Sequence, residues 1–143
     1  KQARFAAKYG SGKQMEDMWD HMHTNNIADP VRNEFASSAL GGDNRHHVTS
    51  SLLSKIWMQG DDSARLSVIT HPLHTKEMQQ EALNHPFSII VTSALMSHHT
   101  TTEDLERISG QPKTTKYNRD LATTLWRKTP EERQAYAKKW YHR

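Results

Sequence analysis

Cysteine is absent from this sequence of 143 residues. Disulfide bonds, thiolate metal sites and cysteine nucleophiles are therefore excluded, and a reducing compartment is permitted but not required. The chain also contains no G-x-S-x-G, P-loop or G-x-G-x-x-G segment. No pair of strand-like runs flanks a convincing hairpin turn. These absences point away from a β-rich fold and from the common nucleotide-dependent enzymes.

Long apolar runs are missing as well. Hydrophobic residues make up 34% of the chain, and the mean hydropathy is −0.89. No segment approaches the roughly 20 apolar residues that a membrane span requires. A chain of this length forms one domain or two very small ones. We therefore expect a modest core, with part of the stability supplied by a partner.

Positive charge is missing from one internal segment. Residues 77–106 contain five acidic residues and no Lys or Arg, for a net charge of −5. Residues 107–143 contain ten Lys and Arg against three acids, for a net charge of +7. Residues 1–76 are nearly neutral. This contrast predicts an N-terminal helical region, 1–76, and a C-terminal region, 77–143, whose last part supplies any anion-binding surface.

Helical signals recur along the whole chain. Apolar residues at spacings of three and four occur in 13–23, 48–58 and 86–99, as on one face of a helix. Pro30 follows Asp29 as expected at the first position of another helix. The pattern predicts an all-α protein with seven or eight short helices.

The segment TPEER, residues 129–133, is the strongest helix start in the sequence. Thr129 is predicted as the N-cap and Glu132 as its capping-box partner, with proline at the first helical position. Upstream of it, Tyr117, Leu121 and Leu125 form one apolar stripe of a preceding helix. The two helices are therefore expected to meet at a short break.

This corner has an internal counterpart. Residues 50–69 and residues 119–138 each contain an aliphatic helix ending in Trp, a short break, acids at the next helix start and then an Arg. Such self-similarity suggests a repeat. A Trp at the end of an amphipathic run commonly fills the corner between two helices. Trp57, Trp126 and Tyr136 are thus predicted to be structural anchors.

The C-terminal region resembles an HMG box. The pieces that carry the resemblance are "HPFSIIVTSAL", "YNRDLATTLW" and "TPEERQAYAKKW", with Pro86, Trp126 and Tyr136 in the order of that family. The resemblance covers residues 86–143 and implies a three-helix corner. The upstream counterpart, near residues 17–70, would then be an eroded second copy.

The resemblance also implies a DNA-binding surface. Phe87 would be a wedge into a minor-groove base step, and Ser88 would make a polar contact there. The basic side chains would meet phosphates or an acidic protein surface; these are Arg119, Arg127, Lys128, Arg133, Lys138 and Lys139. The same surface requires no cofactor, metal ion or catalytic residue.

The sequence departs from the family pattern in several places. No Lys or Arg lies between Lys76 and Arg107, whereas HMG boxes carry basic residues through the first helix. Ile90 and Ser93 occupy the aromatic positions of that helix. The segment between the first two helices is longer, and one residue is missing after Trp126. The resemblance therefore supports a helical corner more strongly than it supports DNA binding.

Three functional hypotheses remain. The first is a non-catalytic HMG-box-like module that contacts DNA, RNA or an acidic protein surface. The second is a structural accessory subunit of a large mitochondrial respiratory, ATP synthase or ribosomal complex. The third is a small nuclease using His46 and His47 as acid and base, with Arg45 or Lys55 stabilising the phosphorane. The first two are nearly level.

The basic character of the chain, with a pI of about 9.2, suits a mitochondrial protein. A chain that starts at Lys1 also fits a removed transit peptide. Nuclear and cytoplasmic locations are the alternatives.

Overall fold

The computed structural model describes residues 2–141, and all regular structure in that range is helical. None of its helices is long and apolar enough to cross a membrane. The elements are α1 (Gln2–Tyr9), α2 (Gly12–Thr24), α3 (Asp29–Gly41), the 3-10 helix η1 (Arg45–His47), α4 (Ser50–Gln59), α5 (Asp62–Ile69), α6 (Lys76–Leu83), α7 (Ser88–Leu95), α8 (Thr102–Ser109), α9 (Lys116–Trp126) and α10 (Pro130–Tyr141).

The prediction of an all-α protein is confirmed, but the predicted number of helices was too low. Ten α-helices occur within residues 2–141, against the seven or eight expected. Several of them, including α1 and α8, have eight residues. Two turns of helix hold too few apolar positions for the period of 3.6 residues to emerge from the sequence.

Side-chain caps begin most of these short helices. In each case a hydroxyl or carboxylate oxygen accepts a hydrogen bond from the backbone N–H three residues further on. At Thr129 the predicted capping box is present: Glu132 N donates to Thr129 Oγ1 at 3.2 Å, and Thr129 N donates to Glu132 Oε1 at 2.9 Å. The other capping residues are Ser11, Thr49, Asp61, Thr75, Thr101 and Thr115.

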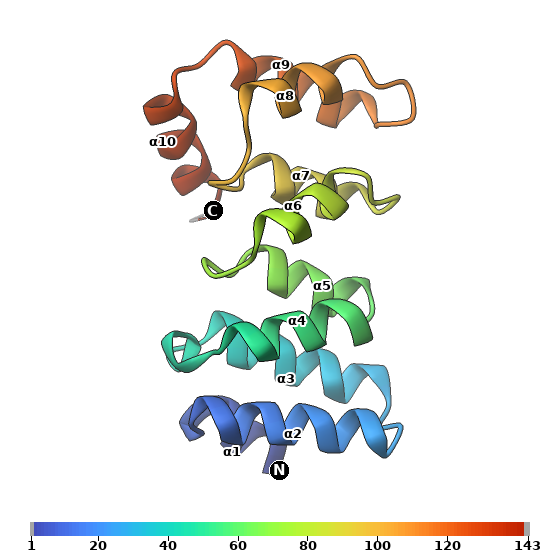
Figure 1. Cartoon of the computed structure of the whole chain (residues 1–143), viewed down its shortest axis with the longest axis vertical. Coiled ribbons are helices and arrows are strands. Elements are labelled where there is room, and N and C mark those ends of the chain that lie inside the picture. The colour runs from blue at the N-terminus through green and yellow to red at the C-terminus, as the bar shows by residue number, and fades with distance from the viewer. Residues whose placement is uncertain (1, 142–143) are drawn as a thin grey trace. The chain divides into compact units, whose positions relative to one another are not determined.

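The chain forms two compact units, Lys1–His74 and Thr75–Arg143. The expected boundary after residue 76 lies two residues further along the chain. In the N-terminal unit, α1, α3 and α5 pack in succession, and α2 packs on α4 (Figure 1). Trp19 lies in the core of this unit, where its Nε1 donates to Gln59 Oε1 at 2.8 Å. In this unit α1, α2 and α3 therefore each pack on the α-helix that follows two places later in the chain, as in helical repeat proteins.

The C-terminal unit is built from helix pairs. Helix α6 packs on α7, α8 packs on α9, and α7 contacts α9. Its core contains Leu83, Ile90, Leu105, Ile108 and Leu125, each at most 1% exposed. None of the described side chains of α10 is buried. This last helix therefore belongs to the surface of the unit.

Candidate nucleic-acid interface

A shallow hollow opens in the C-terminal unit beside the first turn of α7. Its volume is about 660 Å³. Four large apolar side chains of this unit are exposed within the described residues, and three of them line the hollow. Exposed apolar side chains are usually scattered, so their gathering makes this hollow a candidate binding surface. The lining residues are Pro86, Phe87, Ser88, Ile89, Thr92, Tyr117 and Trp140.

Three aromatic side chains reach this hollow from three separate elements. Phe87 is the N-cap residue of α7 and is 44% exposed, and Tyr117, in the first turn of α9, is 61% exposed. Trp140 comes from the last turn of α10 and is partly exposed. Phe87 is thus a surface residue, which is the placement that a base-contacting side chain requires.

A buried amide fixes the two helix starts that carry these rings. Asn118 is 0% exposed, and its Nδ2 donates to the backbone oxygen of Ser88 at 3.0 Å and to Ser88 Oγ at 3.1 Å. The hydroxyl of Thr92 donates to Asn118 Oδ1 at 2.6 Å. A buried amide without these partners would cost roughly 1–3 kcal/mol. The network therefore holds the first turn of α7 against the first turn of α9, and the Ser88 hydroxyl takes part in it.

Neither the burial of Asn118 nor the exposure of Tyr117 was predicted from the sequence. The predicted stripe placed Tyr117 in the core with Leu121 and Leu125, and both leucines are buried. The buried face instead begins one residue later, at Asn118, and includes Ala122. Spacings of three and four fit either start, and the sequence gives no sign that this amide is buried, because its partners Ser88 and Thr92 lie on another helix.

Two of the predicted phosphate-binding arginines are engaged inside the unit. Arg119 Nη1 donates to the carbonyl oxygens of Pro112 at 3.1 Å and Thr114 at 2.6 Å, which closes the connection between α8 and α9. Arg133 Nε donates to Leu125 O at 2.8 Å. Because the last carbonyls of a helix lack partners within it, this bond caps α9. Both side chains therefore have structural roles.

The other predicted cations are more available. Lys128 Nζ lies 5.6 Å from the ring centroid of Tyr136, within range of a cation–π contact. Arg127, Lys138 and Lys139 are exposed, and within residues 2–141 their side chains make neither a hydrogen bond nor an ion pair. These three residues can meet an anionic partner without breaking contacts of the unit.

The two similar corners, in residues 50–69 and 119–138, each contain an arginine of the second helix that donates to a carbonyl oxygen near the end of the first. Arg65 Nε donates to Trp57 O at 3.0 Å, and Arg133 Nε donates to Leu125 O, so the two bonds are similar but differ by one residue in their position relative to the tryptophan. In both corners the second helix thus caps the first. The tryptophans differ: Trp57 is 7% exposed, as expected for an anchor, whereas Trp126 is 45% exposed and is not enclosed. Trp126 stays exposed because the helix that follows it, α10, buries none of its described side chains.

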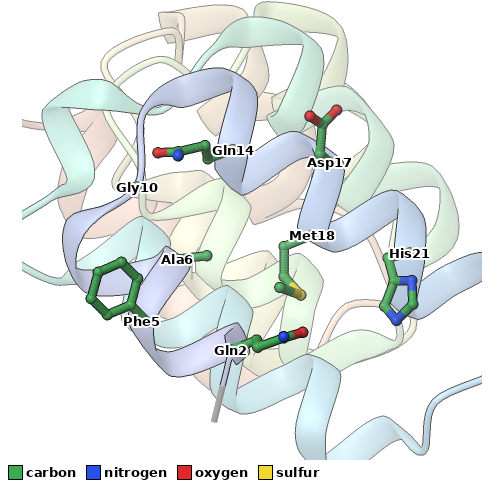
Figure 2. Close-up of a pocket in the computed structure, with 8 residues that line it drawn as sticks. All are labelled: Gln2, Phe5, Ala6, Gly10, Gln14, Asp17, Met18 and His21. Carbon is green, nitrogen blue, oxygen red and sulfur yellow. The ribbon is translucent and has the colours of Figure 1, made fainter.

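The N-terminal unit carries a second recess, between α1 and α2 (Figure 2). It has a volume of about 340 Å³. Figure 2 shows Met18 between the two helices, with Asp17 and His21 on the α2 side. Beside it, the rings of Phe5 and Tyr9 are 66% and 69% exposed, with centroids 5.2 Å apart. The lining residues are Gln2, Phe5, Ala6, Gly10, Gln14, Asp17, Met18 and His21.

The histidine loop considered for a nuclease forms η1. His46 and His47 are exposed, with ring centroids 4.3 Å apart. Arg45 Nη1 donates to the carbonyl oxygen of Gly42 at 3.0 Å. Lys55 forms ion pairs with two acidic residues of α2, at 2.7 and 2.8 Å. Both cations assigned to that mechanism are therefore engaged within the N-terminal unit.

A buried histidine ties η1 to the end of this unit. His71 is 3% exposed, and its Nε2 lies 3.1 Å from Arg45 O while Leu73 N donates to its Nδ1 at 3.1 Å. These bonds require the neutral ring with the proton on Nε2. Burial lowers the pKa of His71, the carbonyl of Arg45 opposes that shift, and the charge of Arg45 adds to it. His71 is thus a structural group that disfavours protonation.

Comparison of the chain with protein-family models, curated proteins and solved structures gives no match in any of the three. The three pieces that resemble an HMG box fall on α7, α9 and α10, and α8 lies between the first two as a helix packed along α9. The resemblance stays a prediction.

Proposed function

We propose that this protein is a non-catalytic nucleic-acid-binding module whose contact surface lies in the C-terminal unit. The observation that carries the proposal is the aromatic-lined hollow beside α7 within a region whose last segment is strongly basic. Aromatic rings offer stacking surfaces to bases, and lysines and arginines neutralise phosphates. The resemblance to an HMG box, with Phe87 at the surface, supports the same class of partner.

The electrostatic part of this surface is carried by cations without internal duties. Arg127, Lys138 and Lys139 project from the end of α9 and from α10. Arg119 and Arg133 contribute charge, but their guanidinium groups stay bound to backbone oxygens. Affinity is expected to depend on salt, because each phosphate contact releases bound counterions.

The first prediction concerns that salt dependence. Binding of a labelled oligonucleotide is measured by fluorescence anisotropy over a series of salt concentrations. The double variant Arg127→Ala/Lys139→Ala is expected to weaken binding and to reduce the slope of log K against log salt by about 1.5, since two phosphate contacts are lost. The matched control is Lys8→Ala/Lys13→Ala, which removes the same charge from exposed positions of the N-terminal unit.

The control decides between local contacts and net charge. Equal loss of affinity in both double variants would mean that only the total charge matters. If the intact, folded protein binds no nucleic acid at low salt, the proposed function is wrong.

A second candidate function is that of an accessory subunit in a larger assembly. The observation that favours it is the recess between α1 and α2 beside the exposed Phe5 and Tyr9, since aromatic residues and methionine are enriched at protein interfaces. An amphipathic helix of another subunit would fit there, with a basic side chain near Asp17. Recovery of the protein in a stable complex that Phe5→Ser releases would favour this alternative.

A further inference from the structure

We infer that the nucleic acid held at the hollow is single-stranded, with unpaired bases stacked on Phe87, Tyr117 and Trp140. This inference rests on the nucleic-acid-binding function proposed above. It adds the state of the strand and the contact residues.

The aromatic surface is concave. Within a duplex both faces of each base are covered by its neighbours, so a side chain must wedge the stack apart to reach them. An unpaired base has an open face that stacks on any aromatic ring. Here the rings of Phe87, Tyr117 and Trp140 line a concave volume of about 660 Å³. A concave surface receives a base, whereas a wedge must project from the protein.

Two of the three rings are held by a rigid part of the unit. Phe87 and Tyr117 each stand next to a residue of the buried network, namely Ser88 and Asn118. Because Asn118 binds Ser88 directly, the starts of α7 and α9 keep a fixed relation. A surface that is already ordered loses less conformational entropy when a ligand binds.

Exposed lysines lie next to the aromatic residues in the sequence. Lys116 precedes Tyr117, Lys139 precedes Trp140, and Lys113 lies in the connection before α9; all three lysines are exposed. Lys116 pairs with Asp120 at 2.7 Å, but both side chains are mostly exposed, so this pair contributes little and can be exchanged for a phosphate. Phosphates next to a stacked base would thus meet a lysine.

The first part of this unit, residues 77–106, is acidic. Residues 77–106 supply all of α7 and most of α6 and α8 and carry no Lys or Arg; the flanking cations are Lys76, at the start of α6, and Arg107, in the last turn of α8. Their exposed acids are Glu77, Glu81, Glu103 and Glu106. A duplex presents two rows of phosphates, and an inserted side chain needs cations on both sides of it. The basic residues of this unit can serve one strand, while the acids disfavour a second.

The test compares a labelled oligothymidylate with a labelled duplex of the same length by fluorescence anisotropy. The single strand is expected to bind roughly tenfold more tightly, and Tyr117→Ala to weaken it by roughly tenfold, because one base loses its stacking partner. Tyr117→Phe keeps the ring and is expected to bind like the original protein. Tyr9→Ala is the matched control, since Tyr9 is similarly exposed but lies in the N-terminal unit.

Tyr117→Leu separates stacking from simple apolar contact. It keeps an apolar side chain without a ring and is expected to bind as weakly as Tyr117→Ala. The helix content of each variant is compared with that of the original protein by circular dichroism. Because Tyr117 is 61% exposed, its substitution should preserve the fold. Full binding by Tyr117→Leu, or equal affinity for single strand and duplex, would overturn the inference while leaving the proposed function in place. Failure to bind either probe at low salt would end both.

Discussion

Single residues in this protein carry more structural weight than their type suggests. Asn118 is a buried amide with three hydrogen bonds, and it organises the candidate interface without facing the ligand. Arg119 and Arg133 are basic residues in a basic region, yet their guanidinium groups bind backbone oxygens. Residue type predicted the charge of the surface, but not which charges are available.

His71 gives a prediction at the residue scale. Its pKa is lowered from 6.5, chiefly by burial, so the unfolded chain takes up a proton at a higher pH than the folded protein does. The stabilisation is therefore complete above about pH 6.5 and is lost as the pH falls towards the lower pKa of the folded state. The free energy of unfolding is expected to decrease over this range, by at most about 1.4 kcal/mol per pH unit for one proton.

The measurement is urea unfolding at a series of pH values between about 7.5 and 5.5, followed by circular dichroism. His71→Gln keeps a donor and an acceptor but does not titrate, so its loss of stability should be smaller. His46→Gln, at an exposed position, should retain the full loss. An identical pH dependence in all three proteins would contradict the role given to His71.

At the scale of elements, the helices are short and depend on their ends. An isolated helix of eight residues is unstable in water, so caps and packing must supply its stability. Helix α10 is the extreme case, because none of its described side chains is buried. Arg133 connects it to the rest of the unit: its Nε caps α9, and its Nη2 donates to Thr102 Oγ1 at 3.3 Å.

This arrangement predicts different outcomes for two arginines near the same corner. Arg133→Ala removes the bond to Leu125 O and is expected to lower the free energy of unfolding by about 1 kcal/mol. Arg127→Ala removes an exposed side chain that makes no hydrogen bond or ion pair within residues 2–141, and it should change the free energy of unfolding by less than about 0.5 kcal/mol. Urea unfolding measures both. Equal effects on stability would mean that the bond from Arg133 contributes nothing to the corner.

At the scale of the whole molecule, charge and aromatic exposure are divided between two compact units. The basic segment and the hollow belong to the unit Thr75–Arg143, while the unit Lys1–His74 is nearly neutral. Helical stacking and the recess between α1 and α2 belong to the N-terminal unit. The two proposed functions thus use different units.

The four tryptophans provide a test of this division. In NMR spectra, addition of oligothymidylate is expected to shift the indole N–H signal of Trp140, which lines the hollow. The signals of Trp19 and Trp57, buried in the N-terminal unit, should stay in place. Shifts confined to Trp19 and Trp57 would move the binding surface to the other unit.

The helical class, the capping box at Thr129 and the basic character of residues 107–143 could all be predicted from the amino-acid sequence. These properties depend on neighbours within a few residues or on composition, so the chain displays them directly. Phe87 was also identified from sequence, through the resemblance, but its exposure could not be, because a residue at a helix start can face either core or solvent.

The set of side chains that forms the candidate interface could not be predicted from the sequence, because it depends on how the helices pack. Tyr117 and Trp140 join Phe87 because residues from α9, α10 and the start of α7 line one hollow, and Asn118 is buried because its partners come from another helix. The availability of each cation likewise depends on carbonyl oxygens several residues away. Burial and hydrogen bonding are properties of residues distant in the chain, and folding alone brings those residues together.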